Sequence, residues 1–419
     1  MEPTDTTIKC NSLVLKVASR CNLNCTYCYM YNMGDSTYKN QPKVMSDAVV
    51  DGILQKTLLH CRRHNIEEFL FVFHGGEPLL AGFEFYEKFV SKAVNWLLPG
   101  VKPIFRIQTN ATLLTEEWCE LFGRLNIHVG ISLDGTPEDN DLFRIDHSGK
   151  GSYAKIIRGL KIAQQSPFLE SKPGILSVLN VNADPIKTYE HFKDLQVNSV
   201  DFLFPDSNYD QLPPPAHNNN ETAYADWLIQ LFDRWLYEPD NKRMSIRLFE
   251  GIIMAILGGD ASDEFLGFAN NELLVIETNG GIESVDVLRI CGDGFTKRDA
   301  NVLTHEFDEA LQNDLSMLYN LSHKKLCKQC MACPVKDICG GGSLPHRYSR
   351  NNGFNNPSVY CEDLLKLITH IQNKVLEQLP GELLNSCGID FLHFEDAKKM
   401  IQQPISDFAE QDFCELENF

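Results

Sequence analysis

The sequence predicts an α/β protein in which a partial (β/α)6 barrel, similar to a TIM barrel, is followed by a smaller cysteine-rich domain. Six short apolar runs in the first 205 residues have the length and composition of buried strands. A helical pattern follows each of the first five runs, and the cysteines gather in two short segments. Alternating strands and helices favour a parallel sheet covered by helices.

The predicted strands all end in loops that carry polar residues. Ser46, Thr115 and Ser152 are candidate N-caps of the helices that follow three of the strands. Because chemistry in such barrels sits at the carboxyl ends of the strands, these loops are the expected site. The predicted strands are LVLKV (13–17), EFLFVF (68–73), IFRIQT (104–109), IHVGISL (127–133), GILSVLNV (174–181) and VDFLFP (200–205).

The pattern changes after the sixth strand. A Pro/Asn-rich loop leads into two amphipathic helices, in which Trp227 and Trp235 are expected to be core residues. The cysteine-rich segment follows, and the last residues mix a helical pattern with acidic side chains. We therefore expect a barrel, a helical bridge, a cysteine-rich domain and a helical tail, with boundaries at 1–215, 216–270, 271–375 and 376–419.

Charge and cysteine content limit the function. The 419 residues carry 57 acidic and 38 basic side chains, a net charge of -19, which argues against nucleic acid or an anionic membrane as the partner. There is no apolar run long enough to span a membrane and no signal-peptide pattern, so we expect a cytoplasmic protein. In a reducing compartment, 14 cysteines indicate metal or redox chemistry.

The first cysteine cluster has a specific spacing. Cys21, Cys25 and Cys28 form a Cys-x3-Cys-x2-Cys motif with Tyr27 before the third cysteine, and Gly-Gly-Glu-Pro at 75–78 follows the next strand. This combination resembles the radical S-adenosylmethionine (SAM) superfamily and extends over about the first 205 residues. A zinc site is the weaker interpretation, because it needs a fourth ligand and the nearest histidine, His64, is on a predicted helix.

The resemblance implies a [4Fe-4S] cluster held by three thiolates, with one iron left open for SAM. In that family, reductive cleavage of SAM gives a 5'-deoxyadenosyl radical that takes a hydrogen atom from the substrate. The resemblance also implies which residues contact SAM: glycines at the methionine amine, a glutamate that supports either the glycine loop or the amine, polar groups near ribose and methionine, and an arginine at the carboxylate. These residues are Tyr27, Gly75, Gly76, Glu77, Asn110, Ser132 and Arg144.

The second cysteine cluster resembles a SPASM domain, which often holds two auxiliary [4Fe-4S] clusters. Two positions depart from the pattern: Ser343 and Asp286 stand where cysteines are expected. The remaining cysteines imply a single auxiliary cluster with a thiolate on every iron, although a zinc site is an alternative. We do not expect a second auxiliary cluster on Cys291 and Cys327. The four implied ligands are Cys330, Cys333, Cys339 and Cys361.

The segments ETNGGIESVDVL, CGGGSLPHRYS and GFNNPSVYCEDL resemble radical SAM/SPASM maturases that form three-residue cyclophanes in ribosomally made peptides (RiPPs). The resemblance implies an oxidoreductase that forms a bond between an aromatic ring and a Cβ. Hydroxylation, an ether or thioether link and anaerobic sulfatase maturation remain open, as does a non-enzymatic zinc-stabilised binding module. Candidate bases for the released proton are Asp206, Asp286, His346 and Tyr348.

The partners implied are a ribosomally synthesised precursor peptide and a reductant such as flavodoxin or ferredoxin. The sequence does not identify a domain that would bind the leader of such a peptide, since the first predicted strand begins by residue 13. We expect the peptide to dock on the barrel, the bridge or the cysteine-rich domain, or through a separate protein.

Overall fold

The computed structural model describes residues 8–217, 220–259, 265–388, 390–402, 414–417 and 419. The chain divides into two compact units. Unit 1 combines residues up to 176 with 271–320, and unit 2 combines 177–270 with the chain from 321 onward. No helix in the described part of the chain is both long and apolar enough to cross a membrane. The domain boundaries expected from the sequence stay a prediction.

Unit 1 contains a mostly parallel sheet with the order β5-β4-β3-β2-β1-β8-β9. Only β9 runs antiparallel to its neighbour. The strands are β1 (Ser12–Ala18), β2 (Glu68–Gly75), β3 (Lys102–Thr109), β4 (Ile127–Ser132), β5 (Gly174–Val178), β8 (Leu273–Ile276) and β9 (Ile282–Glu283). The predicted α/β fold with a mostly parallel sheet is confirmed, and five of its six predicted strands lie here.

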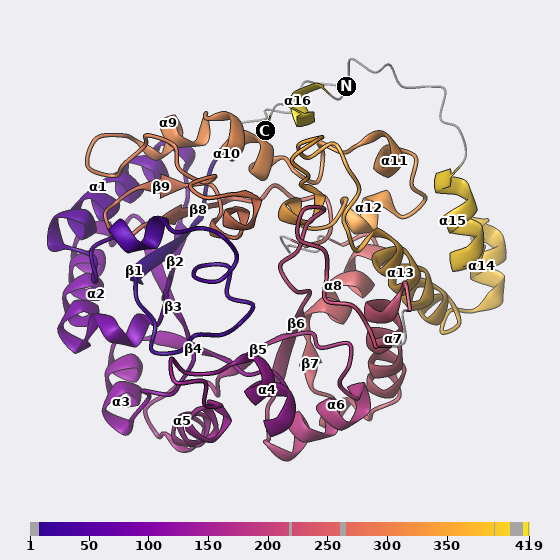
Figure 1. The fold of residues 1–419 in the computed structure, drawn as a ribbon, viewed down its shortest axis with the longest axis horizontal. Coiled ribbons are helices and arrows are strands. Elements are labelled where there is room, and N and C mark those ends of the chain that lie inside the picture. Colours follow the sequence, from indigo (N-terminus) through magenta and orange to yellow (C-terminus); the bar gives the residue numbers. More distant parts are fainter. Residues whose placement is uncertain (1–7, 218–219, 260–264, 389, 403–413, 418) are drawn as a thin grey trace. The chain divides into compact units, whose positions relative to one another are not determined.

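Helices cover the outer side of β1–β4 (Figure 1). Ser46 caps the first of them by accepting a hydrogen bond from Val49 N–H, as predicted. Thr115 and Ser152 also occupy N-cap positions, although neither side chain makes the capping hydrogen bond to a backbone amide of its helix. The helices of unit 1 are α1 (Asp47–His64), α2 (Phe83–Leu97), α3 (Glu116–Arg124), α4 (Pro137–Phe143), α5 (Tyr153–Gln165), α9 (Phe307–Leu311) and α10 (Asp314–Asn320), with short 3-10 helices η1 (Thr37–Asn40), η2 (Pro78–Ala81) and η4 (Asp286–Cys291).

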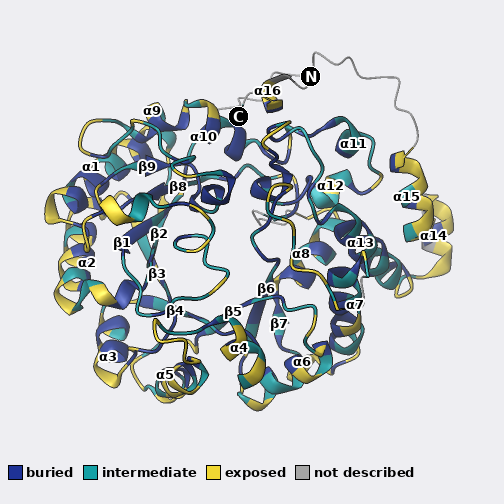
Figure 2. Cartoon of the chain, in the orientation of Figure 1, coloured by how far each residue is buried: buried dark blue, intermediate teal, exposed yellow. Residues whose placement is uncertain are grey.

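The core of unit 1 lies between these strands and helices, where Figure 2 shows the strands as buried and the outward faces of α2 and α3 as exposed. Phe71, Phe73 and Phe105 stack between β2 and β3, and Phe89 from α2 packs edge-on against them. Burying each of these rings contributes about 1.5–3 kcal/mol. The packed strands thus hold the loops at their carboxyl ends in fixed positions.

Unit 2 begins within β5 and contains β6 (Ser199–Leu203), which pairs in parallel with β7 (Ser245–Ile246). Trp227 and Trp235 are buried, so the prediction that they belong to the core is confirmed. The helices are α6 (Pro185–Asp194), α7 (Ala223–Leu236), α8 (Arg247–Ile256), α11 (Lys328–Met331), α12 (Lys336–Cys339), α13 (Cys361–Leu376), α14 (Gly381–Cys387), α15 (Phe394–Gln402) and α16 (Cys414–Glu417), with 3-10 helices η3 (Asp240–Lys242) and η5 (Leu344–Arg347). Part of the expected helical tail, residues 403–413, lies outside the described residues.

Candidate functional site

The first three cysteines lie in the loop directly after β1. The amide of Cys28 donates to the carbonyl of Cys25 (3.1 Å), and the Cys21 thiol accepts from the amide of Leu23 (3.4 Å). The pKa of Cys21 is raised to about 12 and that of Cys28 to about 11, mainly because both thiols are buried. Neighbouring thiols raise both pKa values further. A bound cation favours the thiolate forms. Three free thiols in one loop fit the three-cysteine ligation of a cluster that the resemblance implies.

The Gly-Gly-Glu loop after β2 packs on the chain that leads into the cysteine loop. Gly76 N–H donates to the carbonyl of Ala18 (2.8 Å), and Glu77 N–H donates to that of Arg20 (2.9 Å). A Cβ on Gly75 would lie 2.2 Å from the Ala18 oxygen, and one on Gly76 would lie 2.3 Å from the Arg20 oxygen. These glycines are therefore needed for the contact between the two loops. Their contact with SAM stays a prediction.

The Glu77 side chain is fully buried and connects two strand ends. Its Oε1 accepts from Thr109 Oγ1 (2.6 Å) and from Leu79 N–H (3.1 Å), and its Oε2 accepts from Asn110 N–H (2.9 Å). Burial raises the pKa of Glu77, while these hydrogen bonds oppose the rise. Glu77 braces the loop after β2 against the end of β3, as one of its two predicted roles requires.

Two predicted SAM contacts come from the ends of β3 and β4. Asn110 Nδ2 donates to Asn22 Oδ1 (2.9 Å) and lies 3.8 Å from the Cys21 sulfur, so Asn110 contacts the cysteine loop. Ser132 accepts from Gln108 Nε2 (2.9 Å). Neither contact shows what binds there, and their roles toward SAM stay predictions.

Arg144 and Tyr27 form a buried polar group beside the cysteine loop. Arg144 Nη1 donates to Tyr27 Oη (2.8 Å), and Tyr27 Oη donates to Asp134. Burial opposes the charge of Arg144, but Tyr27, Cys25 and Asp134 raise its pKa overall, so it stays a cation. Arg144 Nε is buried with no hydrogen-bond partner among the described residues. An unpartnered guanidinium nitrogen fits the predicted carboxylate of SAM.

Asp286 belongs to a buried cluster that was only partly foreseen. Lys16 on β1 pairs with its carboxylate, and Tyr29 Oη donates to the same oxygen (2.5 Å). Lys16 Nζ also lies 3.0 Å from His74 Nδ1, on the neighbouring strand β2. Burial lowers the pKa of Lys16 to about 7. Asp286 was predicted from the sequence but Lys16 was not, although a lysine inside the apolar run LVLKV is a visible signal.

The segment that carries Asp286 is fixed by a second buried ion-pair network. Arg289, in the same short helix η4, donates to Glu277 (2.5 Å), Glu283 (3.1 Å) and Asp35 (3.1 Å). Glu277 and Glu283 flank the turn between β8 and β9, so the network joins η4 to the sheet. This network limits the movement of the Asp286 carboxylate relative to β1.

The second cysteine set lies in unit 2. Cys330, Cys333, Cys339 and Cys361 line one cavity, as their predicted role as a ligand set requires, and this donor set fits a closed cluster. Cys327 lies next to them. Its pKa is lowered to about 7, mainly because its sulfur accepts a hydrogen bond from the Cys330 thiol. The remaining lining residues are Gln329, Val335, Lys336, Gly341, Ser358, Leu364, Leu365 and Ile401.

Arg347 organises the triple-glycine loop after Cys339. Its guanidinium is fully buried and donates to the carbonyls of all three glycines at 340–342, over 2.7–3.0 Å, and to those of Ser322 (2.8 Å) and Lys325 (3.2 Å). All three glycines have positive φ, between 58° and 77°, which favours glycine. No role for this arginine was predicted from the sequence.

The other candidate bases, Asp206, His346 and Tyr348, belong to unit 2, whereas Asp286 belongs to unit 1. The His346 ring is buried against Tyr360 (4.9 Å between centroids), and burial lowers its pKa to about 3. The carbonyl of Tyr348 accepts from Tyr209 N–H (3.0 Å). Nothing in these contacts tests a catalytic role, so all four stay predictions.

Comparison with known proteins decides the family of the barrel. Residues 15–192 match the model of the radical SAM superfamily. The chain contains a radical SAM domain. This match covers the three-cysteine loop, the Gly-Gly-Glu loop and Arg144, so the resemblance predicted from their spacing is confirmed.

Relatives extend beyond that domain. The cysteine-type anaerobic sulfatase-maturating enzyme of Clostridium novyi is 28% identical over 366 residues, which cover 85% of this chain and 93% of the relative. The serine-type anaerobic sulfatase-maturating enzyme of Bacteroides thetaiotaomicron is 26% identical over 392 residues, covering 89% and 92%. The radical SAM domain and the cysteine-rich region of this chain are therefore both shared with these enzymes.

Solved structures share the same architecture. Native anSMEcpe with bound AdoMet and Kp18Cys peptide superposes with a TM-score of 0.76 at 25% identity, over 87% of this chain and 98% of that one. Streptococcus suis SuiB bound to the precursor peptide SuiA gives a TM-score of 0.53 at 15% identity, over 81% of this chain and 72% of that one. The SuiB likeness shows the fold alone.

Proposed function

We propose that this chain is a radical SAM enzyme that oxidises a side chain of a peptide substrate, and that it forms a carbon–carbon crosslink between a Cβ and an aromatic ring. The main support is the presence, in one chain, of a radical SAM domain and of a cavity in unit 2 that is lined by four cysteines. The relatives that match along most of the chain mature sulfatases, and one similar structure holds a peptide. A peptide or protein substrate is consistent with the net charge of -19.

Different residues of the chain would bind SAM and the two clusters. Cys21, Cys25 and Cys28 would hold the cluster that binds SAM, and Arg144 would pair with the SAM carboxylate through its free Nε. Bound SAM and its cluster supply a 5'-deoxyadenosyl radical, which can take hydrogen from an unactivated carbon. The four cysteines of unit 2 would hold one auxiliary [4Fe-4S] cluster, which supplies an electron acceptor.

Asp286 is the strongest of the four candidates for the base. When a Cβ radical adds to an aromatic ring, the ring carbon must lose a proton and an electron to become aromatic again. The Asp286 carboxylate is held by Lys16 and Tyr29, and Lys16 has a pKa of about 7, so the pair can exchange a proton near neutral pH. His346, with a pKa of about 3, is a much weaker base.

Sulfatase maturation is the second candidate reaction. It is favoured by the similarity to cysteine-type and serine-type sulfatase-maturating enzymes over most of the chain. The crosslink is favoured by the segments around Asp286, Ser343 and Cys361, which resemble cyclophane-forming maturases. The two reactions need different substrates and leave different products, so one experiment separates them. In either case the thiol-rich composition supports a reducing compartment such as the cytoplasm.

The test incubates anaerobically reconstituted protein with SAM, a flavodoxin or ferredoxin reductant, and synthetic peptides encoded by neighbouring open reading frames. A crosslinked product has lost two hydrogen atoms and shows a new bond between a ring carbon and a Cβ by NMR. A product with an aldehyde, which reacts with a hydrazide, would instead support sulfatase-type oxidation. SAM cleavage without any change to any of these peptides would contradict the crosslink proposal.

The base is tested with Asp286→Asn. We expect SAM cleavage within about threefold of wild type but a loss of crosslinked product of about 100-fold, the range of a lost general base. Asp293→Asn is the matched control, because Asp293 is exposed and follows the same helix. The double variant Lys16→Met/Asp286→Asn removes the unpaired buried ammonium if the single variant folds poorly. Full product formation by Asp286→Asn would exclude Asp286 as the base.

A further inference from the structure

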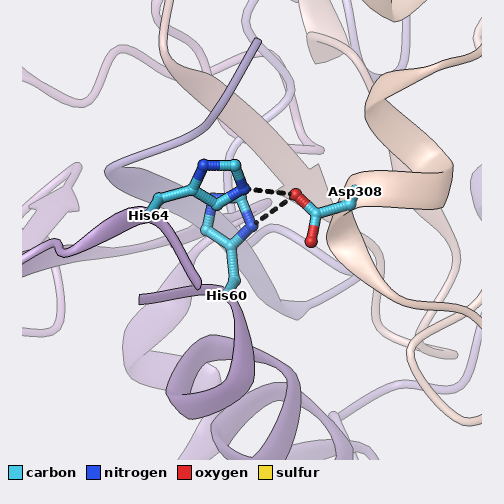
Figure 3. Close-up of side chains that lie close together, drawn as sticks. All are labelled: His60, His64 and Asp308. Atoms are coloured by element: carbon cyan, nitrogen blue, oxygen red, sulfur yellow. Dashed lines mark hydrogen bonds and ion pairs between the residues drawn. The ribbon is translucent and has the colours of Figure 1, made fainter. Parts of the chain in front are cut away.

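A compact group of metal-ligand side chains lies in unit 1 outside the loops that follow the strands. His60 and His64 are four residues apart in the last turns of α1, and Asp308 is in the first turn of α9. Figure 3 shows both imidazoles directed toward the Asp308 carboxylate. The ligand atoms of the three residues all lie within 4.8 Å of one another.

The distances suit a small metal ion with a modest adjustment. Asp308 Oδ1 is 3.1 Å from His60 Nδ1 and 2.6 Å from His64 Nε2. Zn²⁺ sits about 2.0–2.2 Å from nitrogen and oxygen ligands, so neighbouring ligands of one ion are roughly 3 Å apart. The first distance fits, and the second needs to open by about half an ångström. Arg63 pairs with the other oxygen, Oδ2, which keeps Oδ1 facing the histidines.

His60 provides the observation that indicates a ligand. Its side chain is 1% exposed, and its Nδ1 lies 3.1 Å from Asp308 Oδ1. Its other nitrogen, Nε2, lies 3.1 Å from the carbonyl oxygen of Cys10. Nε2 also lies 3.2 Å from the Cys10 amide nitrogen, so the ring has two possible tautomers. With the proton on Nδ1 the ring donates to Asp308; with the proton on Nε2 it donates to the Cys10 carbonyl and presents a bare lone pair to Asp308 Oδ1. In the second tautomer two acceptors face each other, which is favourable only with a cation between them.

The same arrangement is typical of histidines that bind metals. A ligating histidine usually donates its second ring N–H to a backbone carbonyl or carboxylate, which fixes the tautomer and the ring orientation. Two imidazoles and one carboxylate favour Zn²⁺ over Mg²⁺ or Ca²⁺, which prefer oxygen ligands. We infer that His60 Nδ1, His64 Nε2 and Asp308 Oδ1 form a binding site for a divalent transition-metal ion, Zn²⁺ being the ion whose chemistry fits best, with water as its fourth ligand.

The position of this site indicates a structural role. Cys10 lies just before β1 and α1 ends four residues before β2, so the site is at the amino ends of the strands. The cysteine loop follows the carboxyl end of β1, at the opposite edge of the sheet. In barrels of this kind the chemistry is at the carboxyl ends, whereas the amino ends contribute stability. A zinc ion here would tie α1, α9 and the start of β1 together.

The experiment uses full-length protein with its iron-sulfur clusters reconstituted under anaerobic conditions, so that the cysteines are occupied before zinc is added. Zinc and iron per chain are then measured after equilibrium dialysis against buffered Zn²⁺. We expect stoichiometric zinc in wild type and a loss of about tenfold or more in His64→Ala, with unchanged iron. Asp308→Asn, which keeps the shape of the side chain, should also lose zinc, and it is the second variant if His64→Ala folds poorly.

Lys56→Ala is the matched control. Lys56 on α1 pairs with Glu306, the N-cap of α9, at 2.7 Å, so its loss breaks a contact between the same two helices without touching a ligand. We expect Lys56→Ala to retain zinc and a zinc-dependent rise in Tm, and His64→Ala to lose both. X-ray absorption at the zinc edge should show only nitrogen and oxygen neighbours. Sulfur neighbours, or equal zinc in wild type and His64→Ala, would overturn the inference.

Discussion

Gly75 offers the most direct test of how the fold positions the cysteine loop. Substituting alanine would place a Cβ 2.2 Å from the carbonyl oxygen and 3.1 Å from the nitrogen of Ala18, at a position where φ is +134°. Both neighbours are backbone atoms of β1, so no side chain can move aside. The β1 and β2 ends would have to separate, just where Gly76 and Glu77 bond to Ala18 and Arg20.

The matched control is Gly82→Ala. Gly82 also has a positive φ, +83°, but a Cβ there meets nothing within 4 Å. Each substitution carries a backbone cost of about 1–3 kcal/mol, which is reduced by less freedom in the unfolded chain. Gly75→Ala additionally disrupts two backbone hydrogen bonds, at about 1–3 kcal/mol each, so it should cost about 2–6 kcal/mol more than Gly82→Ala. At 1.4 kcal/mol per tenfold, even about 2 kcal/mol lowers the equilibrium ratio of intact to opened loop roughly 30-fold.

The assay is iron content and reductive SAM cleavage after anaerobic reconstitution. Wild type and Gly82→Ala should hold about eight irons per chain, and Gly75→Ala about four, because only the unit 1 set is disturbed. SAM cleavage by Gly75→Ala should fall about 30-fold or more. Wild-type iron and cleavage in Gly75→Ala would refute the claim that the close approach of these loops supports the cluster site.

Two further predictions concern unit 2. Arg347→Met removes the five hydrogen bonds to the glycine loop and its neighbours, so it should lose about four irons while SAM cleavage persists; the exposed Arg350→Met is the control, and equal iron in both would contradict this role. His346 has a folded-state pKa of about 3 against 6.5 when exposed, so its neutral form contributes stability above pH 6.5 that is lost as the pH falls toward 3. Between pH 7.5 and 5 wild type should therefore lose about 2 kcal/mol more than His346→Phe by urea unfolding, and parallel losses would contradict the burial argument.

The barrel could be predicted from the sequence because its signals are local. Apolar runs and helix starts, such as the Ser46 cap, depend on residues close together in the chain. The strands β8 and β9 were missed, although LLVI is an apolar run at 273–276. β8 pairs with β1, about 260 residues away, with Leu13 opposite Leu274. Local patterns do not show which distant segment a strand will join, and the cysteines nearby favoured a separate domain.

The residues of the candidate sites also divide into those with a local signal in the sequence and those without one. Both cysteine sets were predicted from the spacing of the cysteines together with the family resemblance that this spacing supports. Arg347 was missed because its function is to satisfy backbone carbonyls, and a carbonyl has no signature in a sequence. The His60–His64–Asp308 group was missed because its two histidines are local but its carboxylate is 244 residues beyond His64. An i, i+4 histidine pair was the available signal.

Lys16 and Asp286 form a buried pair in which each residue helps to explain the presence of the other. The pattern expects a cysteine where Asp286 stands, and a thiolate there would have bound an auxiliary cluster. Lys16 is fully buried, and a buried ammonium without a partner costs several kcal/mol. The lysine on β1 is therefore tolerated because the Asp286 carboxylate, Tyr29 Oη and His74 Nδ1 surround its ammonium. The pairing with Lys16 and the hydrogen bond from Tyr29 give the carboxylate at position 286 a physical reason that does not involve a cluster, and they support the proposal that Asp286 is the base.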